Sequence, residues 1–172
     1  KEVDVTKLPK IPKFMENRIV YLAEIASAIR VQVERRQGEM LYRPEAEVAT
    51  RLAKQLIRLV RFISFVYGES TVSNKAYRLI QKVAMDTCYS WHQDVFREVA
   101  KHPKGTTKLA IANAAKMTPS KVDRCLFDLF EIDAVTRKKE LNEKGKKNTK
   151  GELGPQSYTW SLSPTMRKAY TE

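Results

Sequence analysis

The sequence predicts a mainly α-helical protein, in which a helical bundle is followed by three further helices and a two-stranded β-hairpin. Apolar residues recur at helical spacing through most of the chain. Glycine and proline interrupt this pattern where helices would end or begin. Near the C-terminus, Tyr158, Trp160 and Leu162 alternate with serine and threonine, which is typical of a strand with one buried face.

The composition favours a packed, basic protein. The 172 residues, of which 42% are hydrophobic, suffice for one ordinary domain or two small ones. Thirty-two Lys and Arg against 20 Asp and Glu give a net charge of +12, which favours nucleic acid as a partner, although a basic protein without such a partner is the alternative. No apolar run approaches the roughly 18 residues of a membrane span and no signal peptide opens the chain, so we expect a cytoplasmic protein with no membrane partner.

Residues 1–14 are interpreted as an extended linker. Pro9 and Pro12 each lack an amide donor and push the preceding residue toward extended backbone. The chain begins with Lys1 rather than Met, so we expect a fragment of a longer protein.

Residues 15–88 predict a helical bundle. A first helix from Met15 to about Gln37 would stop at Gly38, and a second would begin at Pro44 and end at Tyr67, before Gly68. Ser73 is the expected N-cap of a third helix. The expected core faces are Ile19, Leu22, Ala23, Ala26, Ile29 and Val33 in the first helix, Leu52, Leu56, Leu59, Ile63 and Val66 in the second, and Tyr77, Ile80, Val83 and Ala84 in the third.

The pattern of residues 90–163 predicts a second domain, and residues 164–172 are expected to form a tail. One helix from Ser90 would stop at Pro103, a second would open at Thr106 or Thr107, and a third would follow Thr118 with Pro119 at its first position. The strands 134–140 and 156–162 would flank a polar, glycine-rich segment. After a tight turn at Met117, the apolar residues that we expect to share one interior are Ile111, Val122, Leu126 and Trp160.

The stretch IANAAKMTPSKVDRCLFDLFEIDAVTR, residues 111–137, resembles without gaps the helix-turn-helix of many winged-helix regulators and replication proteins. The resemblance implies that residues 90–163 form a winged helix-turn-helix domain that binds DNA, in which the hairpin is the wing. Asp133 stands where the family often has glycine before the first wing strand. Because Asp tolerates left-handed backbone better than most residues, the turn can survive.

The implied DNA contacts come from three places. Near the start of the third helix, Ser120, Lys121 and Arg124 would face base edges in the major groove. At the start of the second helix, Thr106, Thr107 and Lys108 would hold phosphates. The basic wing would contact the minor groove or the backbone through Arg137, Lys138, Lys139, Lys144, Lys146, Lys147 and Lys150.

Two observations favour an interpretation of these residues in which they do not bind DNA. Winged helices also serve as protein-interaction modules, and lysine-rich loops are often only solvated. In addition, Asp123, Asp128 and Glu131 on the third helix would weaken groove binding if they faced phosphates.

The segment TRLAKQLIRLVRFISFVYGESTVSNKAYRLI, residues 50–80, resembles the lid of the minichromosome-maintenance class of AAA+ helicases. The residues in register are Arg51, Leu56, Ile57, Arg58, Leu59, Val72 and Ser73, whereas Ala53 and Lys54 depart from the family's Leu and Glu. The resemblance implies that Arg51 is a nucleotide sensor that reaches the phosphates. The alternative is an exposed arginine on an amphipathic helix.

The sequence carries no catalytic motif of its own. It has no GxxxxGK[ST] loop and no acidic strand end, so this chain alone would not hydrolyse ATP, and any ATP and magnesium would be bound upstream in the parent protein. Two histidines and two separated cysteines give neither a metal site nor a nucleophilic triad.

Three functions remain as hypotheses. The first is the C-terminal part of an AAA+ ATPase, a replicative or mobile-element helicase. The second is a transcription regulator whose helical N-terminal part dimerises or senses a ligand. The third is a protein-interaction module. A homo-oligomer could form through the helical region or through an upstream ATPase domain.

Overall fold

The computed structural model of the chain describes residues 8–31, 33–37, 39–42, 48–139 and 158–171. Within these ranges the protein is mainly helical, with a small antiparallel sheet. The helices are α1 (Lys13–Ile29), α2 (Ala49–Val66), α3 (Asn74–Asp86), α4 (Ser90–Ala100), α5 (Lys108–Ala115), α6 (Pro119–Glu131) and α7 (Pro164–Thr171). The strands are β1 (Arg35–Arg36), β2 (Glu39–Met40), β3 (Thr106–Thr107), β4 (Val135–Lys139) and β5 (Tyr158–Leu162).

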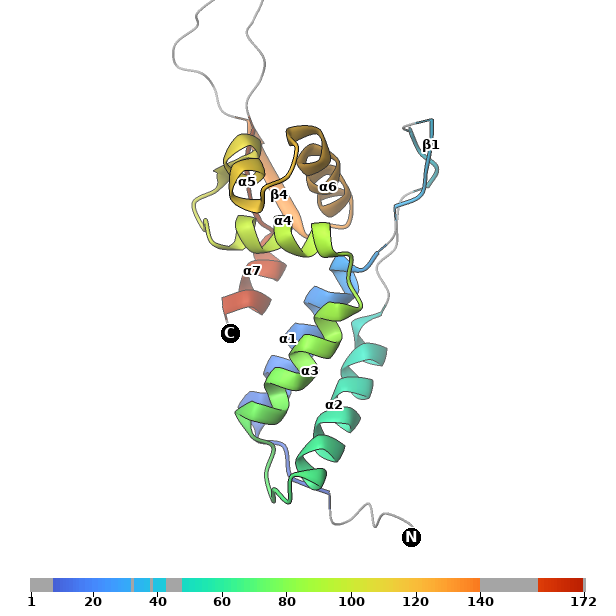
Figure 1. Ribbon diagram of the computed structural model, residues 1–172, viewed down its shortest axis with the longest axis vertical. Helices are drawn as coiled ribbons and strands as arrows, with labels where there is room; N and C mark the ends of the chain where they lie inside the picture. Colours follow the sequence, from blue (N-terminus) through green and yellow to red (C-terminus); the bar gives the residue numbers. More distant parts are fainter. Residues whose placement is uncertain (1–7, 32, 38, 43–47, 140–157, 172) are drawn as a thin grey trace, which may run out of the picture.

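Helices α1, α2 and α3 lie side by side as a bundle, and α4, α5, α6 and the sheet lie beyond one end of it (Figure 1). Their buried apolar side chains form one continuous cluster, which runs from Met15 and Ile80 in the bundle to Leu126 and Trp160 in the C-terminal half. The two halves therefore share a hydrophobic core. No helix formed by the described residues is both long and apolar enough to cross a membrane.

The first helix ends well before the position predicted for it. Helix α1 stops at Ile29, with Arg30 at its C-cap, instead of near Gln37. The chain then turns back as the antiparallel pair β1–β2, in which Arg35 faces Met40, and Gln37 at the turn has a φ of 53°. We call residues 33–37 and 39–42 the arm. In the sequence VQVER, valines alternate with polar residues, and this pattern suits extended backbone as well as helix. Helical spacing therefore extended the predicted helix too far.

The predicted signals at the end of α2 and at the start of α3 are confirmed, but the buried faces of both helices are rotated from the predicted ones. Ser73 caps α3, because its hydroxyl accepts from the Ala76 N–H at 3.3 Å, and Gly68 follows α2 with a φ of 70°. Helix α2 begins at Ala49 rather than Pro44, which lies outside the described residues. Val66 is 79% exposed and Val83 is also exposed, so both core predictions were wrong. Their places in the core are taken by residues on an adjacent face, Ala53, Val60, Ser64 and Ala76.

Both predicted terminal segments are more ordered than expected where they are described. Lys10 pairs with Thr71, and the Arg61 side chain donates to the Pro9 carbonyl at 3.1 Å, so the end of the expected linker is fixed beside α2. The expected tail, residues 164–172, is wrong for 164–171, which form α7. This helix packs on α1 and buries Met166 and Ala169.

The C-terminal half is built on a three-stranded sheet of order β3-β5-β4. The predicted hairpin is confirmed as β4–β5, with Val135 opposite Leu162 and Lys139 opposite Tyr158. The third strand, β3, was missed, because its two threonines also suit a helix start. The turn prediction for Asp133 is confirmed by its φ of 56°. The predicted shared interior is confirmed as well, since Ile111, Val122, Leu126 and Trp160 are all buried.

Gly105 occupies a backbone position that other residues rarely adopt. Its φ is 101°, and an added Cβ would lie 2.3 Å from Cγ2 of Thr159 on the neighbouring strand. We expect Gly105→Ala to lower the free energy of unfolding by at least about 2 kcal/mol, because backbone strain and the clash act together. Urea denaturation measures the change. Gly68→Ala is the control, because Gly68 has open space around it and should lose only about 1 kcal/mol; equal losses in both variants would contradict the role given to Thr159.

Candidate nucleic-acid interface

Helix α6 exposes the three residues that the sequence predicted on its outer surface. Its apolar positions, Val122, Leu126 and Leu129, are fully buried, so the opposite side faces outward. Ser120, Lys121 and Arg124 are exposed there, within the first two turns. Thr118 occupies the N-cap and Pro119 the first helical position, as predicted, although the Thr118 side chain makes no capping bond. The turn at Thr118 and Pro119 therefore fixes where α6 begins. It thereby also fixes which residues of α6 are exposed.

The same three residues line a groove of about 750 Å³ between α6, the start of α4 and the arm. Trp91 of α4 supplies an aromatic wall, and its ring stacks on Tyr89 at a centroid distance of 6.1 Å. The Lys121 ammonium lies 4.5 Å from the centroid of the Trp91 ring. This cation–π contact holds Lys121 at the groove, where it is partly preorganised for an anion.

The carboxylate of Asp128 connects α6, α4 and the arm. It accepts from the Arg35 guanidinium and lies 3.3 Å from Nε2 of His92. Burial alone would raise the pKa of Asp128, but the hydrogen bonds from His92 and Arg35, together with the charge of Arg35, outweigh burial and hold that pKa below its ordinary value. The negative charge of Asp128 is therefore compensated within the protein, and the arm is attached to α6 through it.

A second acidic residue of α6 is compensated in the same way. Oδ1 of Asp123 lies 3.1 Å from Nζ of Lys108, which belongs to the first turn of α5. Both side chains are partly exposed, so the energy of this pair is small, but it sets the local charge. Two of the three carboxylates that could have repelled phosphates are thus paired with cations, and the third, Glu131, lies at the far end of α6.

The residues expected to hold phosphates at the start of α5 are only partly available. Thr106 lies in β3 and is 7% exposed, so its side chain does not reach the surface and is removed from the interface. Thr107 is exposed, but its hydroxyl accepts from the Ala110 N–H at 3.3 Å as the N-cap of α5. Lys108 is the ion-pair partner of Asp123. The pairing of β3 with β5 and the capping of α5 account for these differences from the prediction. The local sequence does not specify either interaction.

The predicted wing residues that the structure describes lie on β4. Arg137, Lys138 and Lys139 are all exposed. The Arg137 guanidinium lies 4.6, 5.2 and 5.4 Å from the ring centroids of Phe130, Tyr158 and Phe127, so aromatic rings hold it next to the outer face of α6. The remaining predicted wing residues, Lys144, Lys146, Lys147 and Lys150, lie outside the described residues.

Cys125 lies in the groove as a buried thiol. Cys125, His92 and Asp128 all line it, which could suggest a cysteine triad. Burial, followed by the nearby Asp128 charge, raises the pKa of the Cys125 thiol to about 11, so the thiol is protonated at neutral pH. Among the described residues no group of three or more His, Cys, Asp or Glu side chains is placed to hold a metal ion.

Several groove residues had no role in the sequence analysis. Arg35 fell within a helix that was predicted too long, and its contact with Asp128 spans 93 positions. Trp91 and His92 were placed on a helix without a function. The signal that could have found them is the pair of aromatic residues Tyr89 and Trp91 at the start of α4. Both side chains are exposed and do not contribute to the core, and large exposed aromatic side chains are informative.

Arg51, the predicted nucleotide sensor, is exposed on the first turn of α2. Among the described residues its guanidinium has no hydrogen-bond or ion-pair partner. Its exposure fits either of the two interpretations drawn from the sequence.

Comparison of the chain with protein-family models, with curated proteins and with solved structures finds no match.

Proposed function

We propose that residues 90–163 form a winged-helix domain that binds duplex DNA, with α6 as the recognition helix. The observation that carries the proposal is the outer face of α6, where Lys121 and Arg124 are exposed while Asp123 and Asp128 are paired with cations. The basic residues of β4 are exposed as well. The order of three helices and a small antiparallel sheet supports the same proposal. The net charge of +12 adds a general attraction to polyanions.

Each group in this interface has a defined task in the proposal. An arginine near the start of a helix in the major groove can donate two parallel hydrogen bonds to guanine, and we assign this task to Arg124. Lys121 would neutralise a phosphate from its position over Trp91. Lys138 and Lys139 on β4 would follow the adjacent backbone, so that association releases counterions and weakens as salt rises.

The test is the affinity of the full chain for a labelled DNA duplex, measured by fluorescence anisotropy. We expect Lys121→Ala with Arg124→Ala to weaken binding roughly tenfold to hundredfold, and to reduce the slope of log affinity against log salt by about 1 for each lost phosphate contact. The control is Lys54→Ala with Arg58→Ala, which removes the same charges from the exposed face of α2. An equal loss in the control would reduce the proposal to nonspecific charge, and unchanged binding by the α6 variant would remove it.

A second candidate concerns the helical bundle. If α1–α3 are the lid of an AAA+ ATPase, the exposed guanidinium of Arg51 is accessible to a nucleotide bound by a neighbouring domain. The test begins with the complete reading frame. If it encodes a phosphate-binding loop, Arg51→Ala in the complete protein should lower ATP hydrolysis, and Lys54→Ala, at a position where the chain departs from the family, should not. A reading frame without such a loop excludes the ATPase and favours a regulator, which two-fold dimers on a palindromic duplex would support.

A further inference from the structure

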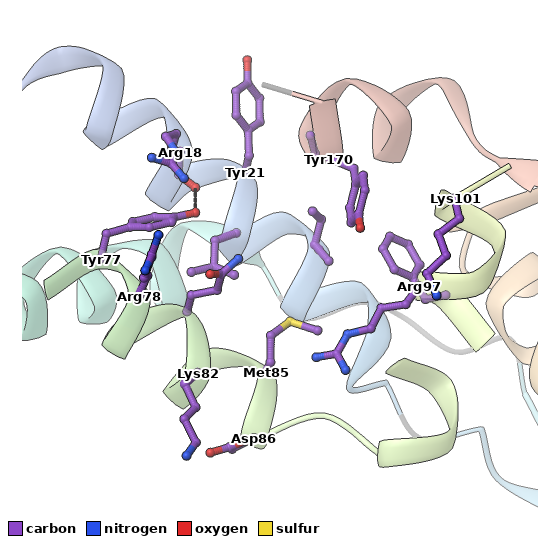
Figure 2. A pocket seen from close by; sticks show the side chains of 15 residues that line it. Arg18, Tyr21, Tyr77, Arg78, Lys82, Met85, Asp86, Arg97, Lys101 and Tyr170 are labelled. Atoms are coloured by element: carbon purple, nitrogen blue, oxygen red, sulfur yellow. Dashed lines mark hydrogen bonds between the residues drawn. The ribbon is translucent and has the colours of Figure 1, made fainter. Parts of the chain in front are cut away.

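A second cavity, of about 890 Å³, lies between α1, α3, α4 and α7 (Figure 2). It shares no lining residue with the groove beside α6, and it is bordered by the later turns of α4 rather than by its start. Among the described residues that line it, cations outnumber carboxylates by five to one. The cations are Arg18, Arg78, Lys82, Arg97 and Lys101, and the carboxylate is Asp86.

The cations are spread along the cavity and do not converge on one point. Figure 2 shows Arg18 and Arg78 near Tyr77 at one end, and Arg97 and Lys101 at the other, on the side of Tyr170. A single phosphate or carboxylate could reach only one of these groups of side chains. The spacing instead favours an extended chain of negative charges.

Some of these cations are already fixed in place. The Arg18 guanidinium donates to Oδ1 of Asn74 at 3.2 Å and lies 4.2 Å from the centroid of the Tyr77 ring. The Arg97 guanidinium donates to the Gln93 side chain at 3.3 Å, and the Lys101 ammonium is ion-paired with Glu98. These contacts lower the conformational entropy that a ligand would otherwise have to remove. Arg78 and Lys82 are exposed and have no ion pair with any residue that the structure describes.

The cavity also offers aromatic surface beside the cations. Tyr170 of α7 is half exposed, and its ring is held by an edge contact with Phe96 at a centroid distance of 6.1 Å. Tyr21 of α1 lines the same cavity. Cations that track a backbone together with aromatic rings on which bases stack form the usual combination for binding single-stranded nucleic acid.

We propose that this cavity binds a single-stranded segment of nucleic acid, with phosphates on Arg18, Arg78, Lys82 and Arg97 and one base stacked on Tyr170. A duplex does not satisfy this site, because its bases are already stacked and paired and offer no free face to Tyr170. The proposal does not depend on the duplex site at α6, and the two can be tested independently.

The test uses the full chain and labelled homopolymers of deoxythymidine and uridine, which do not pair with themselves, and measures anisotropy as a function of salt. We expect Arg78→Ala with Lys82→Ala to weaken binding by roughly tenfold and to reduce the salt slope by about 1.4. Tyr170→Ala should weaken it about fivefold or more, whereas Tyr170→Phe, which keeps the ring, should not. Asp86→Asn should strengthen binding, because it removes a carboxylate that lines the site. Binding of both homopolymers or of one supports the site and reports whether the sugar is read.

Three results would overturn the proposal. The first is no binding of either homopolymer by the parent chain at physiological salt. The second is an equal loss in the matched control, Lys54→Ala with Arg58→Ala, which carries the same charge change on α2. The third is displacement of the homopolymer by thymidine monophosphate at equal nucleotide concentration, which would indicate a site for one phosphate. Thermal unfolding of each variant checks that the fold is retained, and duplex affinity should stay unchanged in the cavity variants.

Discussion

Replacing Trp160 with alanine is expected to lower the free energy of unfolding by about 3 to 5 kcal/mol. Trp160 is 2% exposed and lies on β5, the central strand, where it pairs with Thr106 on one side and Arg137 on the other. Its ring receives edge contacts from Phe127 and Phe130 at centroid distances of 6.1 and 6.2 Å. Truncation would leave a cavity and remove these ring contacts together.

Equilibrium unfolding in urea measures this loss, and Trp91→Ala is its matched control. Trp91 is the same residue type in the same half of the molecule, but it is 41% exposed, so its removal should cost only about 1 kcal/mol. Trp160→Phe, which retains a ring, should recover part of the stability. Losses of equal size for Trp91 and Trp160 would show that Trp160 does not organise the shared interior.

Removing the Asp128 carboxylate is the second large change. Asp128→Ala leaves the Arg35 guanidinium and the His92 ring without their shared acceptor, so we expect a loss on the order of 2 kcal/mol. The loss stays below that of a fully buried pair, because Arg35 is about one fifth exposed and can turn toward water. The same change should release the arm from α6, which limited proteolysis within residues 33–42 would detect.

The pH dependence of this contribution follows from the lowered pKa of Asp128. Because its pKa is lower in the folded state than in the unfolded chain, the ionised carboxylate stabilises the fold at every pH above the unfolded value of about 3.9. The stabilisation is then lost as pH falls through the lower, folded pKa. In urea titrations between neutral and acidic pH, Asp128→Asn should therefore show a shallower loss of stability in acid. The parent chain, titrated alongside, is the reference, and equal acid limbs for the two proteins would contradict the role given to Asp128.

Local signals in the sequence determined several parts of the fold. The hydroxyl of Ser73 and the ring of Pro119 each place a helix start within one turn, because capping and a fixed φ act on neighbouring residues only. The alternation around Trp160 placed β5 in the same way. For the candidate interface, helical periodicity was sufficient to put Ser120, Lys121 and Arg124 on the exposed side of α6, since the positions of Val122 and Leu126 fix the opposite side.

Only the tertiary structure decided which of these residues make contacts and which partners they contact. Arg35 reaches Asp128 across 93 positions, and Thr106 becomes a buried strand residue because Trp160 lies opposite it. The cavity of about 890 Å³ likewise combines α1, α3, α4 and α7. The sequence by itself determined the starts of α3 and α6 and the exposed face of α6, since these depend on contacts within a turn. The arm, the third strand and both cavities depend on contacts between distant segments, whose free energy is gained only when the two halves pack into one core.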